Sequence, residues 1–304
     1  MDRENAEFAE AWREHRRYVL NIAYRMLGSV TDAEDMVQEA FARLVREDLD
    51  TIDDVRGWLV VVVTRLCLDQ LRSARAKREA YVGPWLPEPV ISPPGAEPDP
   101  ADRITLDDSV RLALLVVLER LSAAERGAFV LHDVFGFSFE DVGTILGRTP
   151  EATRQLATRA RKRIDAQTEP ARFAVDPAEL RRIADRFIEA SSNGDLDALM
   201  DVLDPNVSGW TDTGGLPGSP RRAVHGRERV AKQFLRFVET FGIRLAPMPV
   251  NGEPGIVAFH DDTLIAVIAL ETRDGLVTRI HGMGNPEKLA YVASLLGTKA
   301  TGAS

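Results

Sequence analysis

Apolar residues recur at helical spacing along the first half of the chain. The pattern predicts helices over residues 8–27, 31–45 and 54–77. Thr31 or Asp32 is the expected N-cap of the second helix. The third helix contains the run WLVVVV, whose β-branched residues alone would also fit a strand. The sequence TRLCLDQLRSARAKRE that follows it favours a buried helix with a basic C-terminal end.

Further helices are expected over residues 111–121 and after Ser122. Beyond them, Ser138 begins a short helix, and Thr149 caps another whose first residue is Pro150. Two short helices joined by a tight turn are typical of a helix-turn-helix. On the second of these helices, the residues expected to face inward are Ala152, Leu156, Ala160 and Ile164.

Residues 79–108 interrupt the helical pattern. Seven prolines within residues 81–100 exclude regular helix or sheet and predict a linker. Tyr81, Trp85 and Leu86 are large apolar groups that a plain spacer rarely needs. They either tuck against the nearest domain or make a specific regulatory contact.

The pattern changes to mixed α and β after about residue 176. Helices are predicted over 178–192, directly after Gly194-Asp195, and over 226–241. The strand-like runs are NVSGWTD, IRLAPMPV, GIVAFHD, TLIAVIALET and LVTRIHGM, with turns at NGEPG, DD and RDG.

Length and composition narrow the class of protein. The 304 residues allow two or three domains, and 44% hydrophobic content fits packed domains. A single cysteine, Cys67, excludes an internal disulfide and a multi-cysteine zinc site. We expect no metal and no cofactor. No apolar run reaches the roughly 20 residues of a membrane span. We therefore expect a cytoplasmic protein that does not bind a membrane.

Charge is distributed unevenly along the chain, whose formal net charge is −9. Residues 56–82 hold six basic and two acidic residues, and residues 148–164 hold six basic and one acidic. Two basic islands in an acidic chain indicate local contact with a polyanion. Solvated helix faces are the alternative interpretation.

The N-terminal half resembles a known family. AYRMLGSVTDAEDMVQEAFARL and DVRGWLVVVVTRLCLDQLRSAR resemble region 2 of an extracytoplasmic-function (ECF) sigma factor, and residues 109–164 resemble sigma region 4. The later segment FIEASSNGDLDALMDVLDPNV resembles a SnoaL-like, nuclear-transport-factor-two-like domain. The resemblance implies a multidomain fold class with two all-α sigma domains followed by an α+β cone. The implied divisions are region 2 at 1–78, a linker at 79–108, region 4 at 109–168, a linker at 169–176, the SnoaL-like domain at 177–296 and a flexible tail at 297–304.

The resemblance also implies partners and site residues. The partners are RNA polymerase core, through the β′ clamp helices, and promoter DNA. Residues expected to bind core polymerase are Asp32, Asp35, Gln38 and Glu39. Those expected at the −10 element are Arg56, Arg65, Arg72 and Arg75, with the loop 46–55 capturing a base. Those expected at the −35 element are Thr149, Glu151, Arg154, Gln155, Thr158, Arg159 and Arg161.

Three further motifs resemble ECF sigma factors of the SigJ type, which carry a fused SnoaL-like domain. They are YVGPWLPEP at 81–89, a degraded glycine motif at 212–216 and NPEKL at 285–289. The glycine motif lacks the family's lysine. The residues expected to make regulatory interdomain contacts are Trp85, Leu86, Pro87, Asp212, Gly214, Gly215, Asn285, Pro286, Glu287, Lys288 and Leu289.

Two other functional classes stay open at this point. A helix-turn-helix regulator with a ligand-binding domain would not require region 2, and a small ligand in the C-terminal domain is possible in either case. An enzyme is the least favoured class, because its candidate acid–base residues show no tight pairing in the sequence. Those candidates are Asp195, Asp212, His225, His260 and His281.

Overall fold

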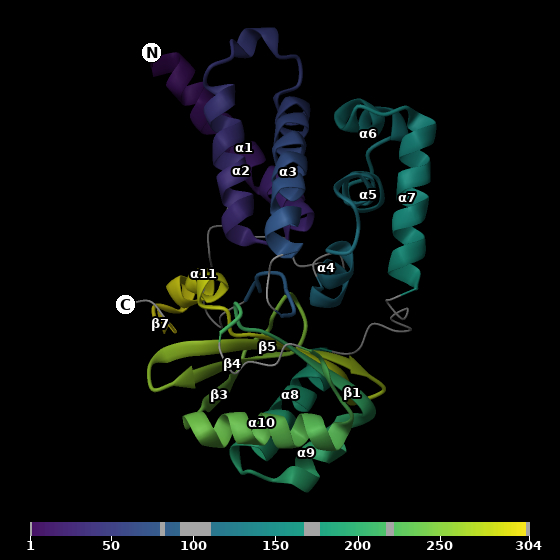
Figure 1. Ribbon diagram of the computed structural model, residues 1–304. Coiled ribbons are helices and arrows are strands. Elements are labelled where there is room, and N and C mark those ends of the chain that lie inside the picture. The colour runs from purple at the N-terminus through teal and green to yellow at the C-terminus, as the bar shows by residue number, and fades with distance from the viewer. Residues whose placement is uncertain (1, 80–82, 92–110, 167–176, 217–221, 302–304) are drawn as a thin grey trace. The chain divides into compact units, whose positions relative to one another are not determined.

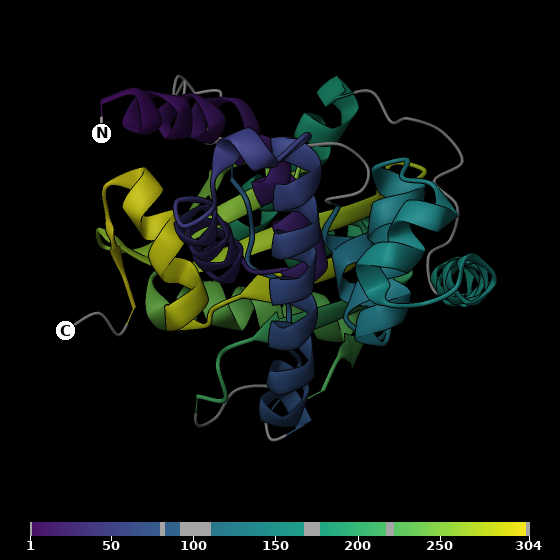
Figure 2. The ribbon, with the colours of Figure 1, turned by 90° about the horizontal axis from the view of Figure 1, so that it is seen from above.

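The computed structural model describes residues 2–79, 83–91, 111–166, 177–216 and 222–301 (Figures 1 and 2). Tyr81 and most of the second half of the expected linker lie outside these residues. The chain divides into two compact units. The first comprises residues 1–79 and 97–170, and the second comprises residues 80–96 and 171–304.

The first unit begins with three long helices, as the sequence predicts. They are α1 (Asp2–Leu27), α2 (Val30–Leu44) and α3 (Val55–Glu79), with a 3-10 turn η1 (Leu49–Thr51) before the last. The expected N-cap of α2 was wrong. Ser29 takes that position, because its backbone is extended and its hydroxyl accepts the N–H of Asp32 at 3.0 Å, whereas Thr31 and Asp32 are already helical.

The rest of the first unit contains the helix-turn-helix. Its elements are α4 (Leu112–Leu118), α5 (Ala123–Ala128), a π-helical turn η4 (Phe129–Val134), α6 (Phe139–Leu146) and α7 (Pro150–Asp165). The predicted N-caps Ser122, Ser138 and Thr149 are confirmed, since each side chain accepts a backbone N–H in the first turn.

The inward face of α7 differs from the prediction at three positions, 152, 153 and 157. Thr153 and Ala157 are buried with Leu156, Ala160 and Ile164, whereas Ala152 is only half-buried. A strict four-residue repeat rotates by about 40° at each step, so it leaves the packed face. The observed face follows the i, i+3, i+4, i+7 spacing of an ordinary amphipathic helix.

The second unit is an α+β domain, in agreement with the predicted fold class. Its helices are α8 (Pro177–Ser192), α9 (Leu196–Val202), α10 (Arg227–Phe241) and α11 (Pro286–Leu296). Its strands are β1 (Leu203–Asp212), β2 (Val224–His225), β3 (Arg244–Pro247), β4 (Gly255–His260), β5 (Thr263–Arg273), β6 (Leu276–Met283) and β7 (Lys299–Ala300).

One mixed sheet organises this unit. The strand order is β2-β1-β6-β5-β4-β3, with β7 pairing with β5, and β1 runs parallel to β6. Helices α8, α9 and α10 cover one face and α11 lies on the other (Figure 1). The core between the sheet and α8–α10 contains Phe187, Leu199, Ile256, Ile268 and Leu270.

The sequence analysis missed several elements of this unit. Helix α11 and the two-residue strands β2 and β7 were not predicted. The expected flexible tail was partly wrong, because Lys299 and Ala300 pair with Thr263 and Leu264 of β5. Parallel pairing with a strand more than 30 residues earlier leaves no local pattern in the sequence.

Candidate nucleic-acid interface

Helix α7 presents a polar face opposite its packed face. Its exposed residues line a shallow hollow of about 470 Å³. The residues around that hollow are Glu151, Arg154, Gln155, Thr158 and Arg159. Thr149 instead caps the helix, because its hydroxyl accepts the N–H of Ala152 at 3.2 Å. Arg and Gln on the exposed face of such a helix can donate to base edges in a major groove.

The arginines at the margins of this face are paired with acids of the same unit. Glu125 lies 2.6 Å from Arg163 Nη1 and 3.5 Å from Arg159 Nε. Arg161 Nε donates to Asp133 at 2.5 Å. These pairings partly neutralise the basic island that the sequence places here. Residues at the centre of the face, above all Arg154 and Gln155, are therefore the better candidates for reading bases.

Glu125 connects the N-terminal cap of α5 to helix α7. Its carboxylate accepts the N–H and hydroxyl of Ser122 at 3.0 and 2.8 Å, which completes a capping box. Burial alone would raise the pKa of Glu125, but these hydrogen bonds and the charges of Arg163 and Arg159 together lower it. Glu125 therefore stays ionised and retains both arginines at neutral pH.

Arg154 is supported by an aromatic ring rather than by an acid. Its Cζ lies 5.0 Å from the ring centroid of Phe139, the first residue of α6. Phe139 in turn stacks on His132, with centroids 3.8 Å apart and an interplanar angle of 24°. The Arg154 side chain is exposed beyond this stack.

Helix α3 carries the residues expected at the −10 element, but they do not form one surface. Arg65 and Arg72 are seven residues apart and share an exposed face, on which Arg72 donates to Asp69 at 2.8 Å. Arg56 lies on the opposite side of α3 from these two residues, and its Cζ is 3.9 Å from the ring centroid of Tyr18. Arg75 lies on α3, and its side chain is outside the described part of the chain.

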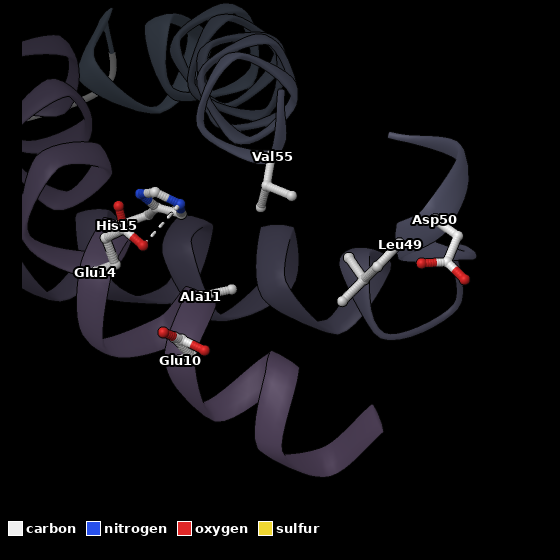
Figure 3. Close-up of a pocket in the computed structure, with 7 residues that line it drawn as sticks. All are labelled: Glu10, Ala11, Glu14, His15, Leu49, Asp50 and Val55. Atoms are coloured by element: carbon white, nitrogen blue, oxygen red, sulfur yellow. Dashed lines mark ion pairs between the residues drawn. The ribbon is translucent and has the colours of Figure 1, made fainter. Parts of the chain in front are cut away.

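The loop expected to capture a base contributes to a hollow of about 270 Å³ (Figure 3). Leu49 and Asp50 of the loop and Val55 of α3 face the N-terminal part of α1 across it. The α1 residues there are Glu10, Ala11, Glu14 and His15. Oε2 of Glu14 lies 3.9 Å from Nε2 of His15. The lining is acidic, so it does not attract the phosphates of DNA.

The expected polymerase-binding residues follow the outer side of α2. Asp35 and Gln38 are exposed, while Asp32 and Glu39 are half-buried. Glu39 accepts from Arg43 at 2.8 Å within the helix. The structure thus places all four on one helix, with Asp35 and Gln38 the most accessible.

Arg126 of α5 links the helix-turn-helix to the three-helix part of the same unit. Its guanidinium donates to the carbonyls of Met26 at 2.7 Å and Leu118 at 2.9 Å, and it pairs with Glu119. Burial lowers the pKa of Arg126 to about 9, which leaves it charged at neutral pH.

Within the second unit, residues of the expected linker are held by a buried ion pair. Asp212 Oδ2 accepts from Lys288 Nζ at 2.7 Å and from the Leu86 N–H at 2.9 Å. Lys288 also donates to the Leu86 carbonyl, and its Nζ lies 3.9 Å from the Trp85 ring centroid. We call Trp85, Leu86, Asp212 and Lys288 the linker clamp.

Neighbouring contacts extend the attachment of the linker. Asn251 and Val90 exchange two hydrogen bonds, of 2.7 and 3.1 Å. Gly214, at φ +70°, packs so tightly beside Asn285 that a Cβ there would lie 3.0 Å from that side chain. The structure therefore brings together the three motifs that the sequence analysis singled out, including Leu86, Asp212, Gly214, Asn285 and Lys288. Pro87 and Leu289 are buried and Pro286 is half-buried, whereas Gly215 and Glu287 are exposed.

The candidate acid–base residues of the second unit do not form an acid–histidine site in the described part of the chain. Asp195 caps α9, and Asp212 belongs to the linker clamp. His281 is buried and pairs with Glu271 at 2.5 Å, a partner that sequence reasoning missed. The Glu271 carboxylate also accepts from Arg279 at 3.1 Å. His225 and His260 lie exposed on β2 and β4.

Within the described residues, no group of three or more His, Cys, Asp or Glu side chains is arranged to hold a metal ion. Among the helices described, none has both the length and the apolar character required to cross a bilayer.

Comparison with known proteins identifies the two helical regions. Residues 11–77 match the family model of Sigma-70 region 2, and residues 111–164 match that of Sigma-70, region 4. The chain is 44% identical over 289 residues to the probable ECF RNA polymerase sigma factor SigI of Mycobacterium tuberculosis, covering 94% of this chain and 96% of the relative. It is 40% identical to the ECF RNA polymerase sigma factor SigJ of the same species, covering 90% of each chain.

A solved structure extends this similarity to the complete fold. The crystal structure of M. tuberculosis SigJ matches with a TM-score of 0.75 and 35% identity, covering 93% of this chain and 98% of that one. The match includes the C-terminal mixed sheet with its helices as well as both helical regions.

Proposed function

The chain belongs to the ECF family of RNA polymerase sigma factors, and we propose how its parts divide the work of such a factor. Sigma factors are non-enzymatic proteins that bind polymerase core and direct initiation at promoters. We assign −35 reading to α7, −10 contacts to Arg65 and Arg72 of α3, and core binding to the exposed positions of α2. Carboxylates there would meet arginines of the β′ clamp helices through charge-assisted hydrogen bonds.

The C-terminal unit, in this proposal, regulates the sigma factor by holding its linker. The linker clamp is the observation that carries this idea, because Leu86 is bonded through both its N–H and its carbonyl. The 31 residues between Glu79 and Arg111 could span about 100 Å if fully extended. Anchoring Trp85 and Leu86 leaves only five residues between Glu79 and Trp85, so the clamp limits how far region 2 can move from the C-terminal unit.

Run-off transcription with purified core polymerase tests this function. We expect full-length protein to produce transcripts from a promoter library that depend on its addition. The variant Lys288→Met should change transcript yield relative to Lys232→Met, which alters an exposed ion pair on α10. Equal yields from the two variants would contradict regulation through the clamp. An absence of transcripts, together with tight duplex binding by the protein alone, would instead identify a helix-turn-helix regulator.

A further inference from the structure

Arg154 is held by an aromatic ring, whereas the other arginines described on α7 are held by ion pairs. Arg159, Arg161 and Arg163 are held through carboxylates, which occupy their hydrogen-bond donors. Arg154 lies against the face of the Phe139 ring at 5.0 Å instead. Stacking on a ring face uses the plane of the guanidinium and leaves its edge donors available.

Phe139 is itself fixed from several sides. Its ring stacks on the His132 imidazole, whose Nδ1 lies 2.7 Å from the Phe137 carbonyl oxygen. The ring also packs against the small buried cluster of Ala128, Leu156 and Ala157. A ring held in this way can hold the Arg154 guanidinium in one orientation before DNA arrives.

Arg154 also lies where base contacts are made by helices of this type. It is the fifth residue of α7, on the exposed face of the helix and in the hollow shared with Gln155 and Thr158. In a helix-turn-helix, residues near the N-terminus of the second helix reach base edges. A guanidinium presented edge-on matches the O6 and N7 acceptors of guanine.

We propose that Phe139 is a positioning residue for Arg154, and that Arg154 reads a guanine of the −35 element. This inference rests on the proposed assignment of α7 to −35 reading. The stack restricts the rotamers of Arg154 in the free protein, so less conformational entropy is lost when the guanine is bound. Phe139 thereby contributes to base specificity without touching DNA.

The test uses full-length protein with core polymerase in run-off transcription, on promoters carrying each of the four bases at every −35 position. The wild type should favour guanine at one position by about 5- to 150-fold, the range for one bidentate pair. Arg154→Lys should abolish most of that preference, because lysine cannot form the planar fork. Phe139→Leu should lower it by roughly 3- to 10-fold, whereas Phe139→Tyr, which retains the ring, should preserve it.

Arg182→Lys is the control, since it makes the same change at an exposed arginine of α8 that is not among the residues assigned to DNA. It should leave the guanine preference unchanged. Thermal unfolding of each variant shows whether the fold is retained, and Phe139→Met replaces Phe139→Leu if the latter does not fold.

Two results would overturn the inference. One is a guanine preference that persists in Arg154→Lys, and the other is a preference that Phe139→Leu and Phe139→Met leave at the wild-type value. Failure of the proposed function itself looks different, because no promoter would then give transcripts that depend on the protein.

Discussion

Replacing Lys288 with methionine isolates the contribution of the linker clamp. Asp212 is 0% exposed; its Oδ2 accepts from Lys288 and from the Leu86 backbone N–H, and its Oδ1 accepts from the Gly214 N–H. Methionine fills a similar volume but removes the cation, so a carboxylate stays buried without its counter-charge. Breaking a buried pair in this way costs about 3–5 kcal/mol.

The matched control removes a lysine from an exposed pair. Lys232 and Glu228 lie one helical turn apart on α10, with side chains 59% and 65% exposed. Solvent screens both charges of an exposed pair, so such a pair contributes little to stability. Lys232→Met should therefore change the free energy of unfolding far less than Lys288→Met.

Hydrogen exchange measured by mass spectrometry reports the effect at the linker itself. A loss of 3–5 kcal/mol in the free energy of opening should accelerate exchange of the Leu86 N–H roughly 150- to 4,600-fold. Lys232→Met should leave that rate nearly unchanged. The double variant Asp212→Asn, Lys288→Met removes both charges, so it should lose less stability than the two single changes added together.

Comparable exchange rates in Lys288→Met and Lys232→Met would refute the reasoning, since the buried carboxylate would then be compensated by other groups. Strict additivity in the double variant would refute it equally, because two charges that contact each other must couple.

Three further outcomes follow from the paired side chains. Glu125→Gln keeps the capping box but releases two arginines of α7. The slope of log affinity for duplex DNA against log salt concentration, measured by anisotropy titration, should therefore steepen by up to about 1.8. An unchanged slope would show that neither arginine reaches a phosphate. Arg126→Met removes the guanidinium that pairs with Glu119 and donates to the Met26 carbonyl. This loss should lower the free energy of unfolding in urea by about 3–5 kcal/mol, with Arg126→Lys losing less. Burial alone would raise the pKa of Glu271, but His281 and Arg279 lower it below its usual value. The ionised Glu271 carboxylate therefore contributes to stability above about pH 4.3, and this contribution is lost as the pH falls through the lowered pKa. Glu271→Gln should accordingly make the midpoint of thermal unfolding less sensitive to pH between 5 and 3.

Local signals were sufficient for several caps whose partner lies within one helical turn. The caps Ser122, Ser138 and Thr149 each bond a backbone N–H three residues ahead, so the residue type and its place before an apolar stripe predict them. Asp195 caps α9 with the same geometry, since its side chain accepts the N–H of Ala198. The sigma-factor resemblance, carried by such segments, is confirmed by the family matches.

Some local signals were present but were not interpreted as structure. Asn285 caps α11, Pro286 is its first residue and Gly297 ends it at φ +62°. These are the usual start and stop signals of a helix. Treating NPEKL only as a family motif concealed them.

The amino-acid sequence by itself determined the helices of the first unit, the caps Ser122, Ser138 and Thr149, the order of the regions and the family. Only the tertiary structure decided which distant groups meet: Lys288 with Asp212 across 76 residues, the Leu86 N–H with Asp212 across 126, and Arg163 with Glu125 across 38. A helix or turn depends on neighbours within about four residues, so its pattern is visible along the chain. An ion pair between distant segments depends on how those segments pack, and the same arginine or lysine would look identical in the sequence whether it faced solvent, DNA or a buried carboxylate.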